Sequence, residues 1–225
     1  MSADAVGWRL VVFAIASAGI LASGRDCQAQ VPIPGYPNTA EALDPREVAL
    51  LPRYCIYTQM FRDKVPGGND PATIKGWYDK LGPTFHNLHH WCLGLMKTNR
   101  AILLSRTEQA RQFYLNFSIV EFDYVIRTAP PDFVLLPEML TRKAQNLILL
   151  DKGPVAVLEL ERAISLKNDY WPPYAYLSDY YKASGNEKKA REVLEDGLGH
   201  APDAAGLQRR LADIDSAHVR HSTKR

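Results

Sequence analysis

The sequence lacks the biases that would assign it at once to a specialised class of protein. Lys+Arg 27 stand against Asp+Glu 25, so the formal net charge is only +2. A dedicated nucleic-acid-binding domain normally has a clustered basic excess, so we expect no nucleic acid as a partner. Charged residues make up 23% and hydrophobic residues 46% of the 225 positions. This composition excludes wholesale disorder and collagen-like or multi-span membrane classes.

Motifs of catalysis are also absent from the sequence. It contains no G-x-S-x-G, no H-E-x-x-H and no C-x-x-C, which are the patterns of serine hydrolases, zinc proteases and thiol redox proteins. The glycines of VPGGND at 65–70 are not followed by the Lys and Ser/Thr of a phosphate loop. A nucleophilic pair of Cys55 with His86 or His90 would need a reduced Cys55. We therefore expect no enzyme.

Long apolar runs are missing, apart from one near the N-terminus. Residues 10–22 carry no charge, but they are shorter than the roughly 20 residues that span a bilayer. They match the apolar region of a secretory signal peptide, with Arg9 in front of it. We expect cleavage after Ala29, with Ala22 or Gly24 as alternative sites. The mature chain would then be periplasmic or secreted; the alternative is an uncleaved inner-membrane anchor through residues 10–22.

Cysteine is scarce, and the signal peptide changes its count. Of the three cysteines, Cys27 would leave with residues 1–29, so that Cys55 and Cys92 remain. Two cysteines in an oxidising compartment form a plausible disulfide. The alternative is two separate buried thiols, since free Cys packs as a small hydrophobic residue.

Helix signals are plentiful, and no segment shows the sustained alternation of a β-strand. An Asp-Pro pair opens a predicted helix at 45–60, with a break near Pro52, and a second Asp-Pro pair opens one at 71–80. A longer helical stretch is predicted from 84 to about 112. We therefore predict an all-α fold.

The C-terminal half contains an internal repeat. In the 34 residues 171–204, aromatic, aliphatic and small residues occupy the packing positions of a helix pair, namely Tyr174, Leu177, Tyr181, Gly185, Ala190, Leu194 and Pro202. This pattern resembles the tetratricopeptide repeat (TPR). It departs from the repeat at Ser178 and Gly197, where the family prefers Gly and Ala. One period upstream, residues 137–170 repeat the pattern with Ala156 as the small residue.

The resemblance organises the rest of the chain. A divergent third unit is predicted at about 99–132, so that a TPR-like domain covers 99–217 and ends in a capping helix at 204–217. Residues 30–98 are an N-terminal helical segment of unassigned type, after the signal peptide at 1–29. The tail at 218–225 is basic, and we expect it to be disordered. The predicted fold is a short α-solenoid of two to three helix hairpins.

The resemblance implies a function in protein binding. In this family the first helices of successive units line a groove that holds a partner's peptide or helix. The groove positions of this sequence are Pro172 and Ala175 together with Glu138, Thr141, Gln145, Ile148, Asp179 and Lys182. We therefore expect a scaffold or adaptor of a Gram-negative cell envelope, with another envelope protein or peptide as partner and no cofactor. Membrane association is expected only if the N-terminal segment is uncleaved.

A histidine cluster offers an alternative function. On an ideal helix His86, His89 and His90 lie at roughly 0°, −60° and 40°, on one face. The i, i+4 pair His86 and His90 has the spacing at which two imidazoles bind one metal ion. The alternative protein is a metal-binding accessory that holds Zn, Cu or Ni. Local hydrogen bonding of these histidines is the simpler interpretation.

Overall fold

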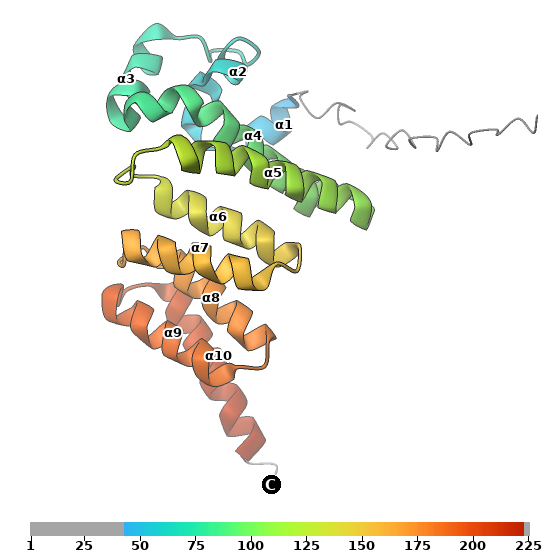
Figure 1. Ribbon diagram of the computed structural model, residues 1–225, viewed down its shortest axis with the longest axis vertical. Helices are drawn as coiled ribbons and strands as arrows, with labels where there is room; N and C mark the ends of the chain where they lie inside the picture. The colour runs from blue at the N-terminus through green and yellow to red at the C-terminus, as the bar shows by residue number, and fades with distance from the viewer. Residues whose placement is uncertain (1–42, 223–225) are drawn as a thin grey trace, which may run out of the picture. The chain divides into compact units, whose positions relative to one another are not determined.

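This computed structural model describes residues 43–222, with side chains as far as Ser216. All the regular elements in these residues are helical (Figure 1). The N-terminal part contains α1 (Pro45–Val48), η1 (Arg53–Tyr57), α2 (Gln59–Arg62), α3 (Pro71–Leu81) and η2 (Gly82–Asn87). The larger part contains α4 (Leu88–Asn99), the π-helical turn η3 (Arg100–Leu104), α5 (Glu108–Thr128), α6 (Leu136–Leu149), α7 (Gly153–Leu166), α8 (Pro172–Ala183), α9 (Glu187–His200) and α10 (Ala205–Ser222). Within residues 43–222, no helix is long and apolar enough to cross a membrane.

Aspartate caps start the first helices as the sequence predicts. The side chain of Asp44 accepts a hydrogen bond from the Arg46 backbone N–H at 2.8 Å, and that of Asp70 accepts one from Thr73 at 2.8 Å. Each side chain thus satisfies a backbone donor that the first turn leaves free. The predicted helix at 71–80 is confirmed as α3. The predicted break near Pro52 within 45–60 is also confirmed: the chain forms α1, η1 and α2, because Pro52 has no backbone N–H to continue the first helix.

The predicted helix from 84 to about 112 is also divided. It begins as the 3₁₀ turn η2, continues as α4 and ends in the π turn η3, where Ser105 N–H bonds to the Arg100 carbonyl at 2.9 Å. Thr107 then caps a new helix by accepting from the Ala110 N–H at 3.2 Å. The local cap therefore overrides the helical periodicity that runs through this segment.

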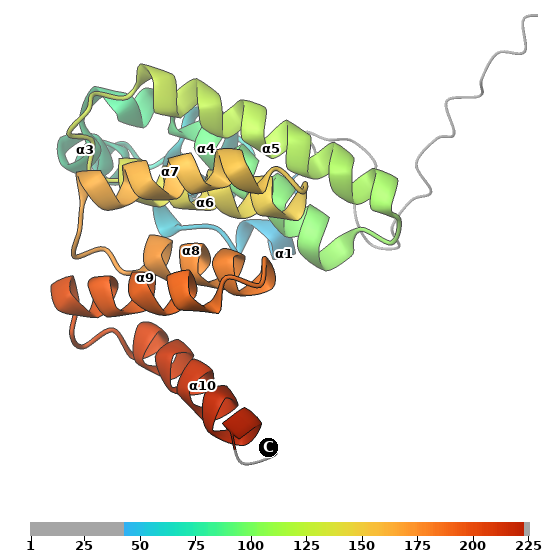
Figure 2. The same cartoon turned by 60° about the horizontal axis from the view of Figure 1, so that its bottom comes forward.

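Three helix pairs follow one another in the larger part: α4 with α5, α6 with α7, and α8 with α9, followed by α10 (Figures 1 and 2). Ala156 in α7 and Ala190 in α9 are both 0% exposed and lie 34 residues apart. A small residue at this point lets the two helices of a pair approach closely. The two predicted repeats are therefore confirmed, while the upstream pair begins at Leu88 rather than near residue 99.

The turns inside the two repeats have the same geometry. Between α6 and α7 the Lys152 N–H bonds to the Leu147 carbonyl at 2.9 Å, and between α8 and α9 the Asn186 N–H bonds to the Tyr181 carbonyl at 2.8 Å. Such a hydrogen bond, from an N–H to the carbonyl five residues earlier, ends a helix and needs one residue with positive φ. Gly185 supplies it in the second turn with φ 76°, and Asp151 supplies it in the first with φ 57°.

A buried polar contact fixes the stacking of the first two pairs. Asn146 of α6 is fully buried, and its side-chain amide donates to the Thr98 hydroxyl at 2.7 Å and to the Ser118 hydroxyl at 2.6 Å. These acceptors belong to α4 and α5. Because an unpaired buried amide is costly, this network favours one register of the three helices.

The N-terminal part shares a hydrophobic core with the helix pairs. Side chains from α1 and η1 pack in one cluster with side chains of α4, α5 and α6, including Val48, Leu51, Leu88, Phe122 and Leu140. Three contacts hold this part on α4 and its end. A disulfide joins Cys55 to Cys92, the Trp91 indole donates to the Tyr54 hydroxyl at 2.9 Å, and Glu47 pairs with Arg100. Residues 43–98 are therefore packed against the repeats rather than separate from them.

Candidate functional site

The groove positions that the resemblance implies lie on α6 and α8, the first helices of the two repeats. Six of the predicted side chains reach solvent, namely Glu138, Gln145 and Ile148 on α6 and Pro172, Asp179 and Lys182 on α8. We call these six residues the first-helix face. α6 and α8 contact each other directly, so the face extends across two successive repeats.

Two predicted groove residues are part of the packing instead. Thr141 is only 2% exposed, and its hydroxyl donates to the Pro137 carbonyl at 2.7 Å. Ala175 is 3% exposed and packs in one cluster with Ala190 and Leu194. The prediction of Thr141 as a partner-binding residue is thus corrected: its hydroxyl is used within its own helix, which leaves a partner nothing to contact.

The final helix supplies a neighbour of the first-helix face that the sequence did not indicate. Arg210 of α10 binds the Asp179 carboxylate with two nitrogens, Nε to Oδ1 at 2.9 Å and Nη2 to Oδ2 at 2.8 Å. This paired hydrogen bond raises the pKa of the Arg210 guanidinium. The sequence placed Arg210 on the wet side of the capping helix, because the contact joins residues 31 positions apart.

Phenolic side chains surround the α6 end of the face. Glu138 and Arg142 form an ion pair with N to O at 4.0 Å. Burial, with the negative charge of Glu138, raises the pKa of Tyr170 to about 12. Burial also raises the pKa of Tyr54, and the charge of Glu138 adds to that effect. Both phenols are therefore neutral at physiological pH, and this end of the face presents one anion, one cation and a half-buried phenol.

The aromatic run at 170–181 divides between the core and this surface. Tyr174 is 1% exposed, and its hydroxyl donates to the Asn168 carbonyl at 3.1 Å, while Leu177 is also buried. The predicted packing roles of Tyr174 and Leu177 are therefore confirmed. Tyr170 and Tyr176 are only half-buried, and Tyr170 lies close enough to Glu138 to feel its charge. Helical spacing alone does not distinguish buried aromatic residues from those at the surface, because it predicts every aromatic residue at that spacing to be buried.

The three histidines do not share one regular helix. His86 lies in the 3₁₀ turn η2, whereas His89 and His90 lie in α4, so the i, i+4 geometry assumed for His86 and His90 is wrong. His90 Nδ1 lies 2.6 Å from the Glu121 carboxylate, and His89 Nδ1 lies 3.0 Å from the His86 carbonyl. Burial, reinforced by the neighbouring His90, lowers the pKa of His89.

The contact between His89 and His86 is the local hydrogen bond that the simpler interpretation expects, whereas the contact between His90 and Glu121 joins α4 to α5. Among the side chains described, no group of three or more His, Cys, Asp or Glu is arranged to hold a metal ion. Metal binding by His86, His89 and His90 stays a prediction.

The disulfide candidate is present in the structure. Cys55 in η1 and Cys92 in α4 are bonded, with their Cα atoms 5.6 Å apart. Both side chains are fully buried. The signal peptide, its cleavage site, the alternative anchor at 10–22 and residues 223–225 lie outside the described residues. The tail predicted to be disordered from 218 is instead helical as far as Ser222, because α10 continues beyond the predicted capping helix.

Comparisons with known proteins give one kind of similarity. Neither a scan against protein families nor a comparison with curated proteins finds a match to this chain. Among solved structures, the chain is similar to the first TPR of Spaghetti (RPAP3) bound to HSP90 peptide SRMEEVD, with 18% sequence identity and a TM-score of 0.41. The similarity covers 56% of this chain and 95% of that one. Independently of this similarity, the α6–α7 and α8–α9 pairs, whose Ala156 and Ala190 lie 34 residues apart, have the TPR-like arrangement that the sequence predicts.

Proposed function

We propose that this chain is a protein-interaction scaffold of the bacterial cell envelope that binds a protein or peptide through the first-helix face. One observation carries the proposal: side chains from two successive repeats reach solvent together on α6 and α8. They offer an acid, an amide, an aliphatic group and the ammonium of Lys182. A surface of this kind suits a partner of mixed polarity better than a polyanion or a purely apolar helix.

The periplasm is the proposed location, and two features support it. The uncharged run at 10–22 has the pattern of a secretory signal peptide. The Cys55–Cys92 disulfide also fits export, because disulfides persist in oxidising compartments and are rare in the cytosol. Export would place the scaffold among envelope proteins, from which its partner would come.

Site-specific photo-cross-linking in cells tests the proposal. A benzoylphenylalanine side chain replaces Gln145 or Lys182 in the full chain, one position at a time. Glu161 on α7 and Lys188 on α9 are the controls, because both are exposed on the second helices of the same repeats. We expect one distinct adduct from both positions of the face, and none from the controls.

The design separates a specific surface from general stickiness. Equal adducts at all four positions, or adducts at the controls alone, would overturn the assignment of the first-helix face. Fractionation of the same cells, with and without residues 1–29, tests the location. Recovery of the full-length chain in the cytoplasmic fraction, with free thiols at Cys55 and Cys92, would overturn it.

A further inference from the structure

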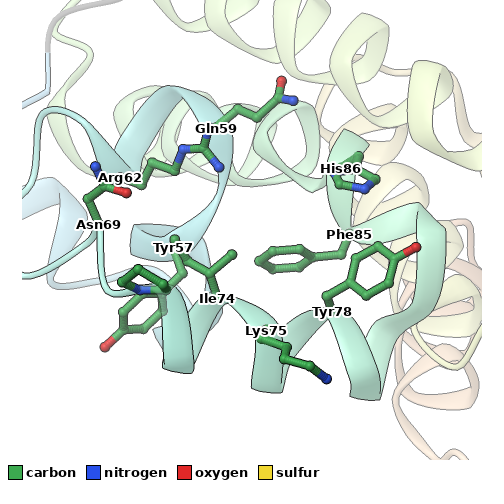
Figure 3. Close-up of a pocket in the computed structure, with 10 residues that line it drawn as sticks. Tyr57, Gln59, Arg62, Asn69, Ile74, Lys75, Tyr78, Phe85 and His86 are labelled. Atoms are coloured by element: carbon green, nitrogen blue, oxygen red, sulfur yellow. The ribbon is translucent and has the colours of Figure 1, made fainter.

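One feature that the first-helix face leaves unexplained is a pocket in the N-terminal part of the chain. Its volume is about 530 Å³, within the range of small-molecule sites. It is formed by residues of η1, α2, α3 and η2 and by the loop before α3 (Figure 3). None of the lining residues belongs to α6–α10, so the pocket is separate from the first-helix face.

The wall of the pocket is aromatic and aliphatic. Ile74 and Phe85 lie in its middle, with Tyr57 beside them and Tyr78 at one end (Figure 3). Phe85 is 4% exposed, so its ring is held by the core and presents one fixed surface. Tyr78 is further oriented by the imidazole of His86, whose ring centroid lies 5.1 Å away. A flat apolar group would stack on these rings with little reorganisation.

The charge of the pocket has one sign. Among the described residues that line it, none is acidic, while Arg62 and Lys75 are cationic. The Lys75 ammonium is already paired with Asp79 on its own helix at 2.7 Å. Figure 3 shows Lys75 directed away from the rings, whereas Arg62 lies beside Asn69 at the end opposite His86. Arg62 is therefore the cation that a ligand would meet.

The Arg62 guanidinium has hydrogen-bonding capacity to spare. Its Nε is buried and has no hydrogen-bond partner within the described part of the chain. The Asp63 carboxylate is 3.8 Å from this nitrogen, too far for a hydrogen bond. Protein atoms cover this nitrogen, but the side chain as a whole is 38% exposed. A ligand's acceptor would therefore meet the outer nitrogens of the guanidinium.

The backbone fixes the position of this arginine. At Gly68 a Cβ atom would lie 2.5 Å from the Ile56 carbonyl oxygen and 2.8 Å from the Arg62 Cα. The loop before α3 thus rests directly on α2, at a place where only glycine fits. A guanidinium placed in this way can form two parallel hydrogen bonds to one carboxylate.

We propose that this pocket binds a small aromatic carboxylate, with the carboxylate on Arg62 and the ring on Phe85 and Tyr78. One guanidinium, paired only at 3.8 Å with the exposed Asp63 carboxylate, matches one singly charged planar head. The stacked rings and Ile74 account for the apolar body of the ligand. The positive charge of Arg62 would repel a cation, and a neutral ligand would offer the guanidinium only a weaker, uncharged acceptor.

A matched series of three ligands tests the charge requirement on the unmodified protein. The ligands are 3-phenylpropionate, its neutral amide 3-phenylpropanamide, and the cation 3-phenylpropylamine. Amide chemical shifts of the full mature chain are titrated by NMR at fixed pH and salt. We expect 3-phenylpropionate to bind at least tenfold more tightly than either analogue, with its shifts centred on Tyr57, Arg62 and Tyr78. Equal affinity for the amide, tighter binding of the amine, or no shift in the presence of 10 mM acid would each overturn the proposal.

A pair of arginine variants tests the anchor. Arg62→Gln should weaken 3-phenylpropionate at least tenfold and leave the weak binding of the amide unchanged. Arg53→Gln is the control, because Arg53 is exposed in η1 and does not line the pocket. Equal effects of the two variants would overturn the role of Arg62. The melting temperature of each variant shows whether it is folded, and the ligand series decides the matter if Arg62→Gln is not.

Discussion

Loss of the Cys55–Cys92 disulfide should destabilise the protein by an amount that follows from the chain itself. The bond joins residues 37 positions apart. The chain-entropy relation for a loop of that length gives about 4 kcal/mol at 25 °C. For a domain of this size, that corresponds to a fall in melting temperature of roughly 8–16 °C. Both sulfurs are buried in the core between η1 and α4, so local rearrangement on reduction adds to the loss.

The assay is urea denaturation of the mature protein, followed by circular dichroism with and without reductant. The double variant Cys55→Ala/Cys92→Ala is the control, since reductant should leave its transition unchanged. Hydrogen exchange should speed up most in residues 53–57, which then depend on the Trp91–Tyr54 hydrogen bond and the Glu47–Arg100 pair. If reduction lowered the free energy of unfolding by less than 1 kcal/mol, the reasoning would be refuted.

Three further changes test the packing. Glu47→Gln removes the carboxylate that now binds the buried Arg100 guanidinium at 2.5 Å and 2.7 Å. The free energy of unfolding, measured by urea denaturation, should therefore fall by about 3–5 kcal/mol, whereas Glu47→Met/Arg100→Met should be near neutral. An equal loss in the two variants would contradict this. Asp151→Gly relieves a positive φ of 57° in a turn where the next repeat already has Gly185, and should add about 0.5–1 kcal/mol, against a loss for Gly185→Asp. Gly197→Ala should cost about 1–3 kcal/mol, because the new Cβ would lie 2.8 Å from Tyr174 and Leu207 side-chain atoms; an unchanged melting temperature would contradict that contact.

The repeats are predictable from sequence because their signals are local. A 34-residue interval between Ala156 and Ala190 requires the same helix pair twice, and the Asp-Pro caps act within three residues. Even the departure at Gly197 is explained by packing: Tyr174 occupies the space that the methyl group of the usual alanine would fill.

The sequence does not indicate the long-range ion pairs of the core and of the first-helix face. The Glu47–Arg100 pair spans 53 positions and the Asp179–Arg210 pair spans 31. No spacing rule connects such residues. The histidine prediction was wrong in its geometry because a single 3₁₀ turn changes the angle between His86 and His90. The sequence VPGGND at 65–70 lacks the residues of a phosphate loop, and it does not indicate the pocket beside Arg62.

The affinity of the cross-linked partner for single variants tests the central claim most directly. The partner captured at Gln145 is purified and titrated against the wild-type chain, Gln145→Arg and Glu161→Arg. Both substitutions introduce an arginine at an accessible position, one on the first-helix face and one on α7. The net charge rises by one in Gln145→Arg and by two in Glu161→Arg, so the control carries the larger change. The account predicts at least tenfold weaker binding for Gln145→Arg and a change below twofold for Glu161→Arg. Equal affinity of the wild-type chain and Gln145→Arg would contradict the claim that the first-helix face binds the partner.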